Sequence, residues 1–267
     1  MLFLFTQRQA KKEYDFVPYK YGCYSYSANA DLTAMAHKGI LTETLSSFTL
    51  NDTADYLNML KPEDRAYLQE INSTYGTKSY NVLMKYTYVR YPYWAINSMA
   101  TNILSPAELA KVAESRPKSD KIILFTIGYE GISLEEYLNR LIRNDVKVLV
   151  DVRNNPVSMK YGFSKSTLKR FCDNMGIQYV HFPEVGIRSE QRQELNTQDD
   201  YNRLFADYRA AILTRTQATQ NDILGLLIKY QRIALTCFEA NICQCHRKHL
   251  AEAISRLPKF NYELKHI

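Results

Sequence analysis

The sequence predicts an α/β domain with a mainly parallel, Rossmann-like sheet and flanking helices, preceded by a mostly helical, winged-helix-like domain. Two observations favour the parallel sheet. After residue 121, short apolar runs alternate with segments of helical periodicity, the order expected of strands joined by crossover helices. Polar side chains follow four of these runs directly, and the carboxyl ends of parallel strands meet at one ligand-binding edge.

The first part of the chain, residues 1–115, favours helices interrupted by a short hairpin. Two helices followed by a hairpin are the outline of a winged helix. The second helix carries Lys38 as a cation together with Asp31, so we weigh DNA binding and protein binding equally for this domain. Helical patterns cover 2–9, Ser27–Lys38, 61–73 and 78–89, and Ser105 and Pro106 open a further helix. Residues 16–22 are predicted as an extended loop or strand, and 40–50 alternate as a β-hairpin does.

The polar stretch Arg116–Lys121 contains a proline and has no periodicity. Such a composition is typical of a linker. We therefore predict domains at 1–115 and 122–267, joined by residues 116–121.

The second domain opens with a strand, a helix and a second strand. Ile122–Thr126 is an apolar run suited to a strand buried on both faces. Ser133 and Glu136 form a capping box for the helix that follows, and residues 146–152 are again apolar apart from Lys147. The remaining predicted elements are a helix capped by Ser164, a strand at 177–182, a polar loop at 187–199, helices at 200–213 and 219–230, a strand at 233–237, a helix at 246–257 and a short strand at 262–267.

Composition limits the compartment and the partners. No apolar run approaches the roughly 20 residues that span a bilayer, and the opening residues lack the features of a signal peptide. We predict a cytoplasmic protein without a membrane partner. Five cysteines, an odd number, do not indicate a disulfide scaffold. The net charge of +6 is spread along the chain and permits nucleic-acid binding without requiring it.

Candidate catalytic residues lie at the predicted strand ends. Asp151 and Glu239 supply carboxylates, and His181 or His246 can transfer protons. Cys245 begins a helix, where the partial positive charge lowers a thiol pKa, so it is the candidate for a reactive thiolate.

Candidate anion-binding residues lie at the same edge. Arg153 and Arg247 offer bidentate contacts, and the helix that begins near Arg247 adds free amides. Tyr129, Asn155 and Glu184 follow the other strands and are predicted to contact the same ligand.

A metal site is not predicted. Cys237, Cys243, Cys245 and His246 include soft ligands, but their spacing lacks the paired C-x-x-C pattern of structural zinc sites. Cys237 is interpreted as a small buried residue at a strand end. The sequence indicates no particular cofactor.

A set of motifs in this domain resembles the DUF488 family, a domain of unknown function. The motifs are Thr126–Tyr129, Leu134–Leu138, Leu149–Arg153, Pro156, Ser158, Phe163–Ser164, Gly176–Ile177, Tyr179–His181, Pro183–Gly186, Ala234–Glu239 and Cys245–Arg247. The resemblance covers about residues 122–267 and implies an α/β domain with a charged, thiol-lined edge. It implies no reaction.

The residues at the predicted edge favour an enzyme that acts on a nucleotide or nucleic acid through an anion-binding pocket. The alternative is a non-enzymatic ligand sensor or regulator whose winged-helix-like domain, residues 1–115, binds DNA or a protein. A thiol-based sulfur or phosphate transferase that uses Cys245 is a third possibility. The sequence leaves open whether the protein is an enzyme.

Overall fold

The structure, a computed structural model, describes residues 1–267 except 46, 193 and 194. The chain forms two compact units, Met1–Arg116 and Pro117–Ile267. Within the described part of the chain, no helix combines the length and the apolar character needed to cross a membrane.

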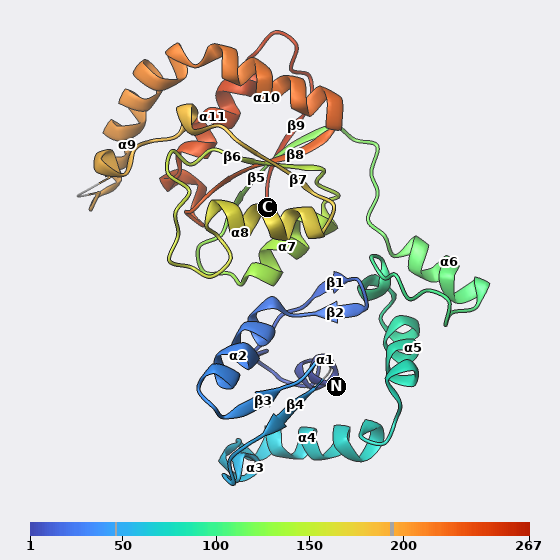
Figure 1. Ribbon diagram of the computed structural model, residues 1–267. Helices are drawn as coiled ribbons and strands as arrows, with labels where there is room; N and C mark the ends of the chain where they lie inside the picture. The colour runs from blue at the N-terminus through green and yellow to red at the C-terminus, as the bar shows by residue number, and fades with distance from the viewer. Residues whose placement is uncertain (46, 193–194) are drawn as a thin grey trace. The chain divides into compact units, whose positions relative to one another are not determined.

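The second unit contains an all-parallel sheet of five strands, which confirms the predicted α/β class (Figure 1). The strand order is β7-β6-β8-β5-β9. The strands are β5 (Ile123–Gly128), β6 (Val148–Asp151), β7 (Gln178–His181), β8 (Arg232–Cys237) and β9 (Glu263–His266). Strands β5, β6 and β8 are buried along their whole length, as continuous apolar runs require.

Helices cover both faces of this sheet (Figure 1). Helices α7 (Leu134–Arg143) and α8 (Lys165–Asn174) lie on one face, and α10 (Gln217–Tyr230) and α11 (His246–Ser255) lie on the other. The strand order explains this division. The chain moves in one direction across the sheet from β5 to β6 to β7, and in the opposite direction from β7 to β8 to β9. Because crossovers between parallel strands are right-handed, the helices of the first two connections lie on one face and those of the last two on the other.

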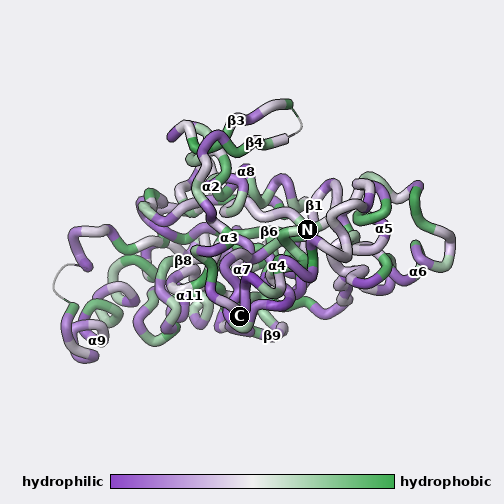
Figure 2. Tube along the Cα trace, turned by 90° about the horizontal axis from the view of Figure 1, so that it is seen from below, coloured by the Kyte–Doolittle hydropathy of each residue, from purple (hydrophilic) through white to green (hydrophobic). Residues whose placement is uncertain are grey.

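The predicted helix over 200–213 is not one regular helix. Helix α9 (Gln198–Asp207) continues into a π-helical turn at Tyr208–Leu213. The buried Tyr208 hydroxyl donates a 2.6 Å hydrogen bond to the carbonyl of Val185, which ties this turn to the loop after β7. Figure 2 shows the contrast between the hydrophobic strand β6 and the largely hydrophilic helix α9.

The first unit is mostly helical and has two small hairpins. Residues 16–22, predicted as an extended loop or strand, lie in a hairpin of β1 (Val17–Tyr19) with β2 (Gly22–Tyr24), which precedes α2 (Tyr26–His37). A second, β3 (Leu41–Glu43) with β4 (Phe48–Leu50), follows α2 within the predicted 40–50 segment, of which residue 46 lies outside the described residues. The winged-helix assignment stays a prediction. The other helices are α1 (Leu2–Thr6), α3 (Tyr56–Met59), α4 (Pro62–Tyr75), α5 (Tyr80–Arg90) and α6 (Pro106–Glu114).

Candidate functional site

A cavity of about 290 Å³ lies at the carboxyl edge of the sheet, and we call it the Cys237 pocket. Its volume is at the lower end of the range of about 300–1,000 Å³ that is typical of ligand sites. The neighbouring strands β5, β6 and β8 bring their carboxyl ends together here, because all three run in parallel. The lining includes Tyr129, Arg153, Asn155, Arg192, Cys237 and His246.

The turn after β8 lies directly against the end of β5. The backbone amides of Tyr129 and Glu130 both donate to the carbonyl of Phe238, at 3.1 and 2.9 Å. A Cβ atom on Gly128 would come within 2.0 Å of the Glu239 carbonyl oxygen, so this close approach requires glycine. The contact fixes the turn that carries Cys237, which lines the pocket, and Glu239, which lies outside its lining.

Asp151 and Arg153 form a buried ion pair in the wall of the pocket. Nη2 of Arg153 donates to Oδ2 of Asp151 at 2.6 Å, and Nε donates to Oδ1 at 2.9 Å. The Tyr179 hydroxyl donates to the same carboxylate at 2.6 Å, and Nη1 of Arg153 donates to the Tyr129 hydroxyl at 2.8 Å. Asp151 is fully buried. The pair therefore fixes the wall, and little of either group is left for a ligand.

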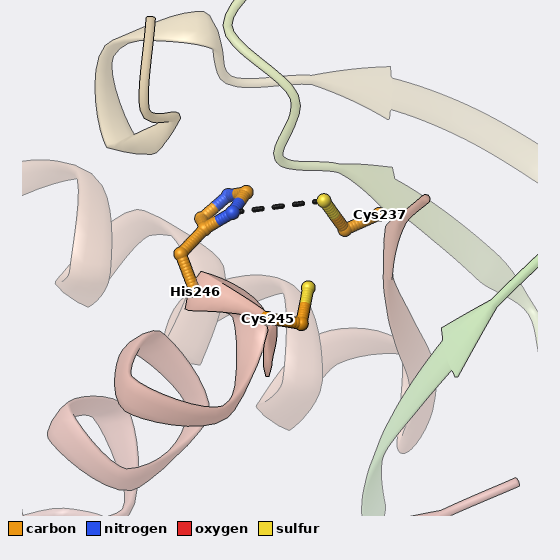
Figure 3. Close-up of side chains that lie close together, drawn as sticks. All are labelled: Cys237, Cys245 and His246. Atoms are coloured by element: carbon orange, nitrogen blue, oxygen red, sulfur yellow. Dashed lines mark hydrogen bonds between the residues drawn. The ribbon is translucent and has the colours of Figure 1, made fainter. Parts of the chain in front are cut away.

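Cys237 and His246 meet at the floor, one from the end of β8 and the other from the start of α11 (Figure 3). Nε2 of His246 lies 3.0 Å from the carbonyl oxygen of Val152. A carbonyl only accepts, so Nε2 carries the proton and Nδ1 faces the Cys237 sulfur at 3.6 Å. The imidazole is thus oriented by the sheet.

The thiols and the imidazole shift one another's pKa. Burial raises the pKa of Cys237, but a hydrogen bond from Cys245 and the charge of His246 outweigh it and hold this pKa well below its usual value. Burial and the same hydrogen bond raise the pKa of Cys245 well above its usual value. Burial lowers the pKa of His246, yet the Cys237 charge leaves it raised overall. These shifts favour a thiolate at Cys237 beside a protonated imidazole.

Arg192, which lines the pocket, forms an ion pair with Glu239, which does not. The pair joins the turn after β8 to a 3-10 turn at Ser189–Arg192. Oε2 of Glu239 lies 3.2 Å from the Cys237 sulfur. Burial and the nearby Cys237 raise the pKa of Glu239. Nη1 of Arg192 donates a hydrogen bond to Oε1 of Glu239. The buried Nε and Nη2 of Arg192 have no hydrogen-bond partner among the described residues.

Cys237 and His246 of the pocket lining, together with Cys245 behind them, have the composition of a metal site. The sulfur atoms of Cys237 and Cys245 and a ring nitrogen of His246 lie within 4.8 Å of one another, and all three residues are buried. The residue spacing did not predict this cluster.

Residues 133–254 match the family model described as domain of unknown function DUF488. This stretch is a DUF488 domain. The match confirms the predicted family over a shorter stretch than the 122–267 expected from the motifs, and it includes Cys237 to His246. No match was found among curated proteins or among solved structures.

Within the DUF488 domain, several predicted site residues lie outside the lining of the pocket. His181 is in the wall behind Arg153, where Nε2 lies 2.8 Å from the Arg153 carbonyl oxygen and Nδ1 lies 3.0 Å from Nζ of Lys165. The buried Arg247 donates from Nη1 to the Glu239 carbonyl at 2.5 Å, so it supports the floor. Cys245 lies behind Cys237 and is fully buried.

Glu184 lines a second cavity of about 880 Å³ beside the first, and it accepts a 2.9 Å hydrogen bond from Thr219. Asn154 lines both cavities. The second cavity also contains Arg188 and Arg215, for which no ion pair is found in the described part of the chain. Of the predicted residues, Tyr129, Arg153, Asn155 and His246 line the Cys237 pocket.

Sequence reasoning missed the other lining residues of the pocket, of which Arg192 and Cys237 matter most for its chemistry. Arg192 comes from the predicted polar loop 187–199, in which residues 193 and 194 lie outside the described residues. Cys237 was interpreted as a small buried residue. The signal for Arg192 was weak, because one arginine in a charged loop has no spacing that distinguishes it from a solvated side chain.

Proposed function

We propose that the DUF488 domain is an enzyme acting on a nucleotide or nucleic acid, whose phosphate binds Arg192 in the Cys237 pocket. The observation that carries the proposal is the pair of buried nitrogens on Arg192 that have no hydrogen-bond partner among the described residues. Leaving buried donors unsatisfied costs about 1–3 kcal/mol each. A ligand that supplies two acceptor oxygens would remove that cost.

The two nitrogens favour an oxyanion over a neutral ligand. Nε and Nη2 lie on one edge of the guanidinium, and this edge forms two parallel hydrogen bonds with phosphate or carboxylate. Glu239 holds the other side of Arg192 through Nη1, so the edge is oriented before a ligand arrives. Ser158 and Ser189 also line the pocket and add hydroxyl donors.

The mouth of the pocket favours a nucleoside over an isolated phosphate. Phe238 lines the pocket and its side chain is 42% exposed, with its ring edge-on to Tyr129 at a centroid distance of 5.3 Å. Val157 and Met159 add exposed apolar groups to the same lining. A flat base can stack on such a ring, and that contact contributes about 1–3 kcal/mol.

The neighbouring cavity extends this proposal to a nucleic-acid chain. Arg188 and Arg215 line it, and Asn154 connects it to the Cys237 pocket. Two cations beyond the first phosphate site suit the next phosphates of a polymer. In this proposal, residues 1–116 bring the substrate or a partner protein to the DUF488 domain.

The test is a binding and turnover screen with nucleoside monophosphates and short single-stranded oligonucleotides. We expect Arg192→Gln to weaken binding roughly 10- to 150-fold, since a charged hydrogen-bonded contact contributes about 1.5–3 kcal/mol. The matched control is Arg203→Gln, whose side chain is 76% exposed in its ion pair with Asp200. It is expected to bind as the wild type does.

Turnover is followed by mass spectrometry of the substrates after incubation. Products that form with the wild type and are lost with Arg192→Gln support the enzyme. Binding without any product would instead favour the ligand sensor. If no nucleotide or oligonucleotide binds, the proposal is wrong.

A further inference from the structure

We infer that Cys237, Cys245 and His246 bind one Zn²⁺ ion at the floor of the Cys237 pocket. Figure 3 shows the two sulfur atoms and the imidazole directed toward one another from the end of β8 and the start of α11. The inference goes beyond the proposed function, because a metal can bind here whatever the substrate is.

The separations of the ligand atoms fit a tetrahedral metal. Zinc bonds of about 2.3 Å to sulfur and 2.0–2.1 Å to nitrogen place these two atoms about 3.5 Å apart at a tetrahedral angle. Nδ1 of His246 and the sulfur of Cys237 are 3.6 Å apart. The complete set lies within 4.8 Å, so closing it around an ion requires shifts of about 1 Å or less.

The orientation of His246 is that of a metal ligand. Its Nε2 proton is directed to the Val152 carbonyl oxygen at 3.0 Å, so Nδ1 is the ring nitrogen that faces the thiols. Metal binding would displace the proton that Nδ1 carries in the ion pair with Cys237. A ligating histidine almost always donates its other ring N–H to a carboxylate or a backbone carbonyl. Because Val152 directly follows β6, the sheet fixes the ring in this position before metal arrives.

The donor set selects zinc among the common cations. Two thiolates and an imidazole suit Zn²⁺ and exclude hard ions such as Mg²⁺ and Ca²⁺, which take oxygen ligands. Three protein ligands leave a fourth position, as in catalytic zinc sites. Oε2 of Glu239, 3.2 Å from the Cys237 sulfur, is placed to occupy that position or to hydrogen-bond a water in it.

The test measures metal binding by the full-length protein under reducing conditions. We expect one equivalent of zinc by elemental analysis after dialysis. We also expect the protein reconstituted with Co²⁺ to show sulfur-to-cobalt charge-transfer absorption in the near ultraviolet. Cys245→Ser and His246→Gln are expected to weaken Zn²⁺ binding at least about 100-fold, because each removes a direct ligand.

Cys243→Ser is the matched control, since this exposed cysteine lies two residues before Cys245. It should retain the metal and the cobalt spectrum. A variant that fails to fold does not block the test, because thiol alkylation of the wild type gives an independent measurement. Because Cys237 and Cys245 are buried with or without metal, alkylation is compared before and after Zn²⁺ is removed by a chelator. Removal is expected to speed the alkylation of Cys237 and Cys245, and not that of the exposed Cys243.

Any of four results would overturn the inference. The first two are a reduced wild type that binds no zinc and a Co²⁺ form that lacks the thiolate band. The others are a Cys243→Ser variant that loses the metal as completely as Cys245→Ser does, and a Cys237–Cys245 disulfide that resists reductant with no metal bound.

Discussion

Replacing Asp151 by Asn tests whether the ion pair behind the pocket is structural. The substitution keeps the side-chain shape and removes the charge. It leaves the Arg153 guanidinium, 7% exposed, without its counter-ion. Breaking a buried ion pair by removing one partner costs about 3–5 kcal/mol, because an uncompensated charge stays buried.

The expected result is a large loss of stability in the second unit. For a unit of this size, 1 kcal/mol corresponds to roughly 2–4 °C in Tm, so the loss corresponds to about 6–20 °C. The matched control is Asp173→Asn, which removes an exposed pair with Lys169 whose side chains are 54% and 48% exposed. Exposed pairs contribute about 0–1 kcal/mol, so the control is expected to unfold within a few degrees of the wild type.

The assay is calorimetry of the full chain combined with tryptophan fluorescence. Trp94 is the only tryptophan, and it packs on Phe3 in the first unit at a centroid distance of 5.3 Å. Its fluorescence therefore follows the first unit, while calorimetry follows both. We expect Asp151→Asn to lower the Tm of the second unit, seen by calorimetry, and to leave the unfolding followed by Trp94 fluorescence unchanged. A loss below about 1 kcal/mol would refute the assignment of a buried, structurally required pair.

Two further predictions concern the elements that position the pocket. Gly186→Ala would place a Cβ atom 2.2 Å from the backbone nitrogen of Asn154. Because the backbone would have to shift to relieve this clash, urea denaturation should show that the free energy of unfolding falls by about 1–3 kcal/mol. The control is Gly225→Ala in α10, where the new Cβ meets no described atom within 4 Å beyond its chain neighbours and the backbone of its own helix. It should raise the free energy of unfolding by roughly 0.5–1 kcal/mol, because alanine favours a helix more than glycine does. Equal effects at both sites would contradict the argument. Tyr208→Phe should cost about 1–2 kcal/mol by the same measurement, because the Val185 carbonyl loses its buried donor, and no loss would show that this hydrogen bond is not needed.

The parallel sheet could be predicted from the sequence because burial on both faces produces uninterrupted apolar runs. Strands β5, β6 and β8 have this pattern and lie at the centre of the sheet. The order of the strands has no comparable local signal, since it depends on which face each crossover takes. The π-helical turn at Tyr208–Leu213 was also missed, because its apolar spacing resembles that of an ordinary helix.

The sequence indicated the edge of the sheet at which the cavity lies, but few details of its lining. Tyr129, Arg153, Asn155 and His246 are the predicted residues that line the Cys237 pocket at this edge. The contact between Cys237 and His246 could not be derived from spacing, because it depends on how the intervening turn folds back onto β5. Periodicity describes regular elements and carries no information about such turns.

Asp151 and Arg192 show why residue type alone does not identify a ligand-binding group. Both are charged residues at the same edge, yet Asp151 has its acceptors engaged by Arg153 and Tyr179, whereas Arg192 has two buried donors without partners in the described structure. Asp151→Asn is therefore expected to change stability more than ligand affinity, and Arg192→Gln the reverse. Titrating both folded variants with the same nucleotide separates the two roles. A folded Asp151→Asn variant that loses as much affinity as Arg192→Gln would show that the carboxylate acts on the ligand and that its hydrogen bonds in the wall are rearranged on binding.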